Sequence, residues 1–205
     1  MKLLTTLLRR ARHSLSVGTD QSAGPTSVFD RVTDPWAWQP ALLRSDHNCF
    51  CNICWWSGDS FGGGFHSEAA ICPNCGSIAR DRYLFFCFIS RTLRDRYNVL
   101  ETSPRLGYEY RLAMRGWFEY LASDFDERSH RADIRLDLQN IELEKGSIDV
   151  LLTPHVLEHV PYTDKALAEI HQLLCPRGRM YLQVPVLQGK TARPTQPEFH
   201  GDDTP

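Results

Sequence analysis

The stretch Ser147–Pro185, SIDVLLTPHVLEHVPYTDKALAEIHQLLCPRGRMYLQVP, decides the fold of this chain. Residues 148–152 form a short apolar run, as expected of a strand that is buried on both faces of a sheet. From Thr163 on, apolar residues recur at helical spacing, and the pair Pro176 and Gly178 ends that helix. Residues 180–184 return to the pattern of a strand. Strand, helix and strand in this order predict a parallel βαβ unit.

Polar residues gather where the first strand of this unit ends. His155, Glu158 and His159 follow the apolar run directly. Ligands of open parallel sheets bind beyond the carboxyl ends of the strands. We therefore expect this edge of the sheet to carry the functional site.

The same stretch resembles a class I S-adenosylmethionine-dependent methyltransferase of the type 11 group. The matching segments are, in chain order, IDVLL, HVLEHV, AL, EI, QLLCPRG and YLQVP. The resemblance implies an α/β fold: a Rossmann-like, doubly wound and mainly parallel sheet of about five strands in the order 3-2-1-4-5. It also implies an enzyme that uses S-adenosylmethionine to methylate an acceptor, which we expect to be a small molecule or a glycan.

The other strands of the sheet are expected upstream, at residues 98–103, 118–124 and 132–137, after a helix over 78–96. In the family, the first strand leads into a glycine-rich loop. The resemblance assigns the acidic position of that motif to Glu101 and its last glycine to Gly107. Ser103 and Arg105 stand where the family has earlier glycines, so side chains occupy positions at which the backbone usually approaches the cofactor closely.

Two acids at later strand ends complete the implied cofactor site. Asp124 resembles the residue that accepts hydrogen bonds from the ribose hydroxyls, and Asp126 is the second candidate for that role. Asp137 and Leu138 resemble the acid and apolar residue that meet the adenine. Each acid has an alternative role as a cap of its own loop.

The acceptor side is expected at the loop after the fourth strand. His155 is our candidate general base, because an imidazole can accept a proton near neutral pH. Glu158 either lines the acceptor side or caps the following helix. For His159 we favour a packing role.

Two C-x-x-C pairs predict a metal site that is independent of the resemblance. Cys51 and Cys54 form the first pair, and 17 residues separate it from Cys72 and Cys75. This spacing is typical of a structural zinc site with four sulfur ligands, in a small zinc-ribbon-like module. Gly76 follows the second pair, where a positive φ would help the chain turn back. Cys49 and His66 are spare candidates, and Cys49 is expected to be a bystander.

Composition narrows the function classes. The 205 residues carry a net charge of −2, which does not suggest a surface for nucleic acid, and no apolar run is long enough to span a membrane. The seven cysteines favour metal ligation in a reducing compartment, and we expect a cytoplasmic protein. No feature specifies an oligomeric state.

Two alternatives to a methyltransferase of small acceptors remain open. The first is a non-catalytic, zinc-containing Rossmann-like binding protein, which the side chains in the first motif would suit. The second is an RNA methyltransferase, in which aromatic residues near the metal, namely Trp55, Trp56, Phe61 and Phe65, would stack on bases.

The expected organisation has four parts. Residues 1–48 form a basic amphipathic segment and a linker, and residues 49–77 form the zinc module. Residues 78–187 form the methyltransferase-like domain, and residues 188–205 form a flexible tail. The family normally adds a helix and an antiparallel hairpin after the fifth strand, and we expect the sheet to lack these elements.

Overall fold

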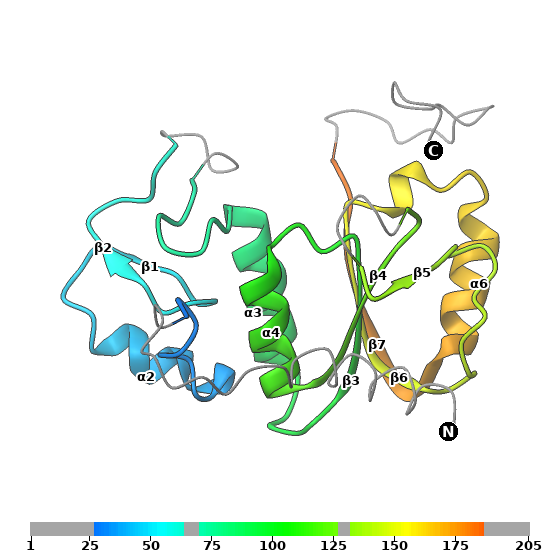
Figure 1. The fold of residues 1–205 in the computed structure, drawn as a ribbon, viewed down its shortest axis with the longest axis horizontal. Helices are drawn as coiled ribbons and strands as arrows, with labels where there is room; N and C mark the ends of the chain where they lie inside the picture. The colour runs from blue at the N-terminus through cyan, green and yellow to red at the C-terminus, as the bar shows by residue number, and fades with distance from the viewer. Residues whose placement is uncertain (1–26, 64–69, 127–131, 187–205) are drawn as a thin grey trace, which may run out of the picture. The chain divides into compact units, whose positions relative to one another are not determined.

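A computed structural model describes residues 27–63, 70–126 and 132–186 of the chain (Figure 1). The chain divides into two compact units, and we describe each by itself. The sheet unit comprises residues 98–104 and the described part of 121–205. The cysteine unit comprises the described part of 12–97 together with residues 105–120. The amphipathic segment, Phe65, His66 and the tail from residue 187 on lie outside the described residues.

A five-stranded sheet has the order β5-β4-β3-β6-β7. Counted along the chain this order is 3-2-1-4-5, with the first strand at the centre, as the resemblance predicts. The pairings β3–β6, β4–β5 and β6–β7 are all parallel. The strands are β3 (Asn98–Thr102), β4 (Glu119–Asp124), β5 (Ile134–Arg135), β6 (Ile148–Pro154) and β7 (Leu174–Gln183).

The helix α6 (Thr163–Leu173) packs beside the sheet and closes the core of this unit (Figure 1). It begins at the predicted residue. Its spacing of apolar positions buries Ala166, Ile170 and Leu173, whereas Leu167 is 39% exposed. These side chains meet Leu100, Leu151 and other buried residues of the strands. Each fully buried leucine contributes about 1.5–3 kcal/mol relative to an exposed one, so this contact holds α6 on the sheet.

The last strand departs from the expected pattern. Residues 180–184 were predicted as the strand, but β7 already begins at Leu174, directly after α6. Leu174 pairs with Ile148 and Arg179 with Val150, so the segment between them forms a bulge. Arg177 has a φ of 71° within it. Pro176 and Gly178 therefore shape a bulge in the strand as well as following a helix end.

Gly178 lies against backbone atoms in this bulge. A Cβ placed on Gly178 would lie 2.9 Å from the carbonyl oxygen of Cys175 and 3.1 Å from that of Ile148. Because backbone cannot rotate away, we expect Gly178→Ala to lower the free energy of unfolding by about 1–3 kcal/mol. Chemical denaturation measures this change. The matched control is Gly116→Ala, where a Cβ meets nothing within 4 Å; a larger loss in the control would contradict the explanation.

Two predicted elements are shorter than expected. The strand predicted over 132–137 is reduced to Ile134–Arg135, because the carboxylate of Asp133 takes the amide of Ala122 at 2.8 Å in place of a ladder bond. The helix predicted over 78–96 is α3 (Ala79–Arg91). It ends because Thr92 is extended and its hydroxyl donates to the carbonyl of Phe88 at 2.8 Å.

The cysteine unit consists of short elements around the four cysteines, with two longer helices. They are η1 (Pro35–Ala37), α2 (Trp38–Leu43), the antiparallel pair β1 (Cys49–Phe50) and β2 (Ser57–Gly58), α3, and α4 (Tyr108–Trp117). Aromatic contacts join its segments. Trp36 meets Phe118 edge-on at 5.5 Å between ring centroids, and Phe88 lies 5.1 Å from Phe118. The sequence analysis did not predict α2 or α4.

Within the described ranges, none of the helices combines the length and the apolar character that a membrane crossing requires.

Candidate functional site

An open cleft lies at the carboxyl ends of β3 and β4 in the sheet unit. It has about 620 Å³ of empty space, with the open mouth included. Thr102 and Ser103 line it after β3, and Ser123 and Asp124 line it at the end of β4. Its apolar lining comes from Phe125, Leu136, Leu138, Val156, Val160 and Pro161.

Asp124 is the buried carboxylate of this cleft, with 7% of the residue exposed. The hydroxyl of Ser103 donates to its Oδ2 at 2.8 Å, and the amide of Asp126 donates to its Oδ1 at 3.1 Å. These two donors hold the carboxylate in one orientation. A carboxylate has about four acceptor positions on its two oxygens, so it can accept hydrogen bonds from several donors.

Ser103 takes the conformation that glycine favours. Its φ is 46°, and its amide donates to the carbonyl of Ser123 at 2.7 Å. A positive φ is costly for a residue with a side chain, and this explains why a glycine suits the position. The added hydroxyl has a use here, since it fixes Asp124.

Asp137 and Leu138 also line the cleft. The Oδ1 of Asp137 accepts the amide of Gln139 at 2.8 Å, so this carboxylate caps its own turn. The structure therefore realises the capping role, and it places the same residue at the cleft. Leu138 is buried, with 5% of the residue exposed, and offers an apolar surface.

Glu101 and Gly107 are not among the residues that line this cleft. Glu101 is buried in β3, where it pairs with Leu152 of β6. Gly107 caps the amino end of α4 in the cysteine unit, with an ordinary φ of −67°. Their roles toward the cofactor stay predictions.

The three polar residues after β6 have separate positions. The Nδ1 of His155 lies 3.1 Å from Oε1 of Glu158, and His155 has a φ of 52°. The Oε2 of Glu158 is buried and has no hydrogen-bond partner in the part of the chain that the structure describes. His159, for which packing was expected, lines the cleft, whereas His155 and Glu158 do not. Gln139 and Phe125 also line the cleft and were not predicted.

The four predicted metal ligands come together in the cysteine unit. The sulfur atoms of Cys51, Cys54, Cys72 and Cys75 all lie within 4.8 Å of one another, and three of these residues are fully buried. Two of the distances, Cys51–Cys75 and Cys54–Cys72, are 3.7 Å. A tetrahedral zinc with bonds of about 2.3 Å to sulfur has edges of about 3.8 Å, so these residues fit that metal.

The two cysteine pairs fold as matching turns. The amide of Trp55 donates to the carbonyl of Cys51 at 2.8 Å, and the amide of Gly76 donates to that of Cys72 at 2.9 Å. Both residues have a positive φ, 55° at Trp55 and 72° at Gly76. The predicted conformation of Gly76 is thus confirmed. Cys49 is outside the cluster, and its thiol donates to the carbonyl of Asp59 at 3.7 Å.

Hydrogen bonds among the neighbouring thiols shift their pKa values in different directions. The pKa of Cys51 falls far below its ordinary value, chiefly because it accepts hydrogen bonds from Cys54 and then from the other two thiols. The pKa of Cys54 rises, chiefly because its proton is held by Cys51. The cluster cannot carry four thiolates without a cation beside it, and a divalent metal supplies that cation.

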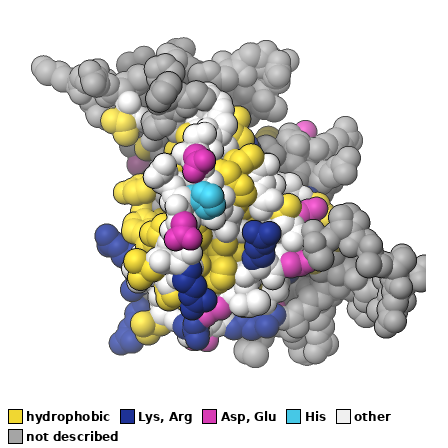
Figure 2. Space-filling view, turned by 90° about the vertical axis from the view of Figure 1, so that its left-hand side faces the viewer, with side chains coloured by type: hydrophobic (Ala, Val, Ile, Leu, Met, Phe, Trp, Pro, Cys, Tyr) yellow, Lys and Arg dark blue, Asp and Glu magenta, His cyan; other side chains and the backbone are white. Residues whose placement is uncertain are grey.

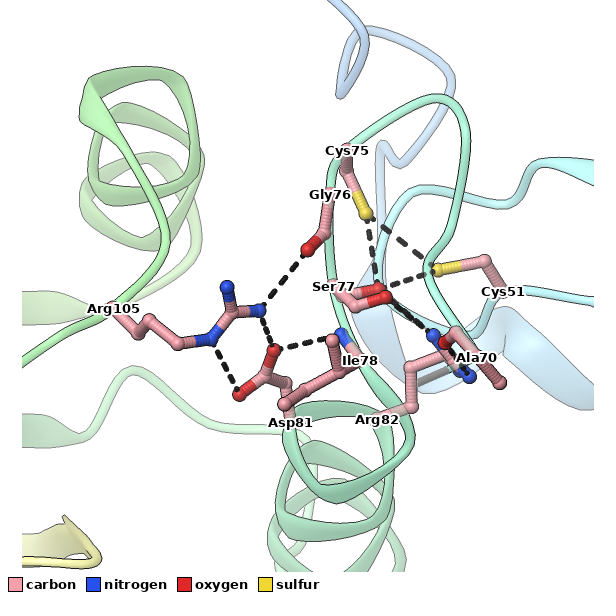
Figure 3. A network of polar contacts seen from close by, with 9 residues as sticks. All are labelled: Cys51, Ala70, Cys75, Gly76, Ser77, Ile78, Asp81, Arg82 and Arg105. Atoms are coloured by element: carbon pink, nitrogen blue, oxygen red, sulfur yellow. Dashed lines mark hydrogen bonds and ion pairs between the residues drawn. The ribbon is translucent and has the colours of Figure 1, made fainter. Parts of the chain in front are cut away.

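A hydroxyl and a guanidinium lie against the cluster. The hydroxyl of Ser77 is 3.2 Å from the sulfur of Cys75 and 3.4 Å from that of Cys51. Arg82 is buried and donates to the carbonyl of Ser77 at 2.5 Å and to that of Ala70 at 2.8 Å (Figure 3). Such outer contacts orient metal ligands and offset their charge.

The methyltransferase domain family matches residues 111–182. Solved structures that resemble the chain include a putative sarcosine dimethylglycine methyltransferase from Galdieria sulphuraria. It is 18% identical, with a TM-score of 0.42, over 51% of this chain and 45% of that one. An S-adenosylmethionine dependent methyltransferase from Mesorhizobium loti is 18% identical, with a TM-score of 0.37, over 47% and 50%.

A further similar structure is phosphoethanolamine N-methyltransferase 2 from Haemonchus contortus in complex with S-adenosyl-L-methionine. It is 18% identical, with a TM-score of 0.39, over 77% of this chain and 35% of that one. The match thus reaches half or less of each of these three solved chains. No curated protein matches the sequence.

Proposed function

We propose that this chain transfers a methyl group from S-adenosylmethionine to a small-molecule or glycan acceptor, since residues 111–182 match the methyltransferase domain family. One observation carries the proposal: the carboxylate of Asp124 lies buried in the cleft at the end of β4, oriented by Ser103. In parallel sheets this is the edge at which nucleotide riboses bind. When bound, the cofactor supplies an activated methyl group on a sulfonium, so the protein mainly has to position it.

Different residues of the cleft would contact different parts of the cofactor. Asp124 would accept hydrogen bonds from the ribose hydroxyls through its carboxylate oxygens. Leu138 and the other apolar side chains would cover the adenine, and Asp137 would take its amino group. Glu101 and Gly107 remain our candidates for the methionine end, from the resemblance alone.

For the acceptor side we propose the pair His155 and Glu158. Their contact at 3.1 Å lets Glu158 hold one ring nitrogen. The other nitrogen is then available to take a proton from an acceptor that loses one on methylation. His159, unlike His155 and Glu158, lines the cleft and would be within reach of a ligand bound there.

This role predicts a selective loss of methyl transfer. We expect His155→Ala to lower the rate about 100-fold or more, the usual size of general-base catalysis, and to leave the affinity for S-adenosylhomocysteine unchanged. The measurement is the transfer of tritium from methyl-labelled S-adenosylmethionine into the low-molecular-mass fraction of a cell extract. His171→Ala, on the exposed side of α6, is the matched control. Equal rates in the two variants would remove His155 from the mechanism.

We also propose that the four cysteines hold one structural zinc ion. Four sulfur ligands leave no open position for water, so the metal would stabilise the fold of the module and take no part in transfer. Free thiols at this site suit a reducing compartment such as the cytoplasm.

An RNA acceptor finds less support. In the cysteine unit the Trp56 ring packs against Phe61 at 5.5 Å, and the guanidinium of Arg82 covers Phe61 at 3.9 Å. These aromatic faces are thus used by the protein itself. On the face in Figure 2, the described Lys and Arg side chains are interspersed with Asp and Glu. Nucleic-acid surfaces instead gather basic residues.

Isothermal titration of the zinc-loaded chain with S-adenosylhomocysteine tests the proposal. We expect saturable binding with one site per chain. Binding of neither S-adenosylhomocysteine nor S-adenosylmethionine would contradict it and would favour the non-catalytic binding protein. Tritium transfer into the RNA fraction of a cell extract, with none into small molecules, would move the acceptor to nucleic acid.

A further inference from the structure

Arg105, which replaces a glycine of the family's first motif, binds the metal module. Its guanidinium donates to the carbonyl oxygen of Gly76 at 3.0 Å (Figure 3). It also forms a two-pronged ion pair with the carboxylate of Asp81.

Both partners of Arg105 belong to the second cysteine turn or to the helix that follows it. Gly76 comes directly after Cys75, and its amide closes the turn on Cys72. Asp81 accepts the amide of Ile78 at 2.9 Å and so caps the amino end of α3. The direction of the Gly76 carbonyl therefore depends on a turn that folds around the metal.

The same loop reaches the cleft two residues earlier. Ser103 holds Asp124 through the 2.8 Å hydrogen bond described above. Only Pro104 separates it from Arg105, and a proline ring restricts its own backbone and that of the residue before it. Ser103 has a φ of 46°, a conformation that a residue with a side chain keeps only when its surroundings hold it there.

We propose that Arg105 couples the metal site to the cofactor cleft, so that metal in the four-cysteine site raises the affinity of the cleft for the cofactor. This inference rests on the proposed function. With the metal bound, the turn at Gly76 holds Arg105, and Arg105 holds the loop in the conformation in which Ser103 orients Asp124. Without the metal, that anchor is lost and the loop samples other conformations.

Thermodynamic linkage makes this coupling reciprocal. If the metal raises the affinity for the cofactor by some factor, the cofactor raises the affinity for the metal by the same factor. The ion pair is partly exposed, with 40% of the Arg105 side chain and 13% of that of Asp81 accessible. We therefore expect a factor of about five, at the low end of the usual range.

The test measures zinc affinity by competition with a chromophoric chelator, with and without saturating S-adenosylhomocysteine. In the native chain S-adenosylhomocysteine should tighten zinc binding about fivefold. In Arg105→Ala the ratio should fall to one. Asp81→Asn should lower it as well, because the amide keeps the acceptor for Ile78 and loses the charge. The matched control is Arg91→Ala, an exposed arginine at the end of α3.

Three outcomes decide the matter. A ratio of one in the native chain, with S-adenosylhomocysteine demonstrably bound, overturns the coupling and leaves the proposed function standing. An unchanged ratio in Arg105→Ala overturns the role of this residue. If zinc-loaded native protein does not bind S-adenosylhomocysteine at all, the proposed function fails, and this inference fails with it.

Discussion

Replacing Cys54 and Cys75 together by serine is expected to abolish zinc retention and to unfold the metal module. Each variant turn loses one of its two thiolates, and serine does not replace a thiolate as a zinc ligand. Structural zinc sites contribute about 10–16 kcal/mol at pH 7, more than the total stability of many domains. A segment with so few apolar residues has no other large source of stability.

Elemental analysis after metal-replete expression, together with hydrogen exchange of the turn amides, measures this result. The native chain should hold one equivalent of zinc, and the amides of Trp55 and Gly76 should be protected only in that form. Cys49→Ser together with Cys87→Ser is the matched control, since both residues lie outside the cluster. Less than half an equivalent in the native chain, or full retention in the double cluster variant, would contradict the zinc assignment.

Replacing Asp124 by asparagine is expected to weaken S-adenosylhomocysteine binding tenfold to a hundredfold. Asparagine keeps the size of the side chain and an oxygen for Ser103. It loses the charge that strengthens hydrogen bonds from the ribose hydroxyls, at a cost of about 1.5–3 kcal/mol. At 1.4 kcal/mol for each factor of ten, this cost gives about the stated range.

Titration calorimetry of three variants separates this role from its alternatives. Asp164→Asn, on the exposed first turn of α6, should bind as the native chain does. Asp126→Asn tests the second candidate acid, whose backbone amide donates to Asp124 at 3.1 Å. A loss in Asp126→Asn with none in Asp124→Asn would transfer the ribose role to Asp126.

The parts of the fold that sequence predicts are those in which spacing along the chain carries the information. Cys51 and Cys54 are close in sequence, and a tight turn brings their sulfurs together whatever the surroundings. The same holds for α6, where the period of the apolar residues selects the buried face. The strand order followed from the resemblance to a known family, whose pattern spans the segment from β6 to β7.

The positions of the other site residues depend on single backbone angles and on contacts with residues far away in the sequence. Sequence placed Ser103 and Arg105 in the first motif as departures from glycine, but it could not show where their side chains point. That depends on a φ of 46° at Ser103 and on the position of Asp81, 24 residues before Arg105. His155 and His159 are four residues apart in sequence, and only the path of the chain after β6 brings His159 to the cleft.

The bulge in β7 and the short β5 have the same origin. A strand pattern states which residues prefer to be extended, whereas its ends depend on hydrogen bonds with neighbours far away in sequence. The carboxylate of Asp133 accepts the amide of Ala122, which a neighbouring strand would otherwise bind. Gly178 fits between the backbones of Cys175 and Ile148. Sequence alone thus determined which chemical groups this protein has and which segments hold them. The tertiary structure decided which groups meet, because hydrogen-bond partners many residues apart are brought within about 3 Å only by the packed fold.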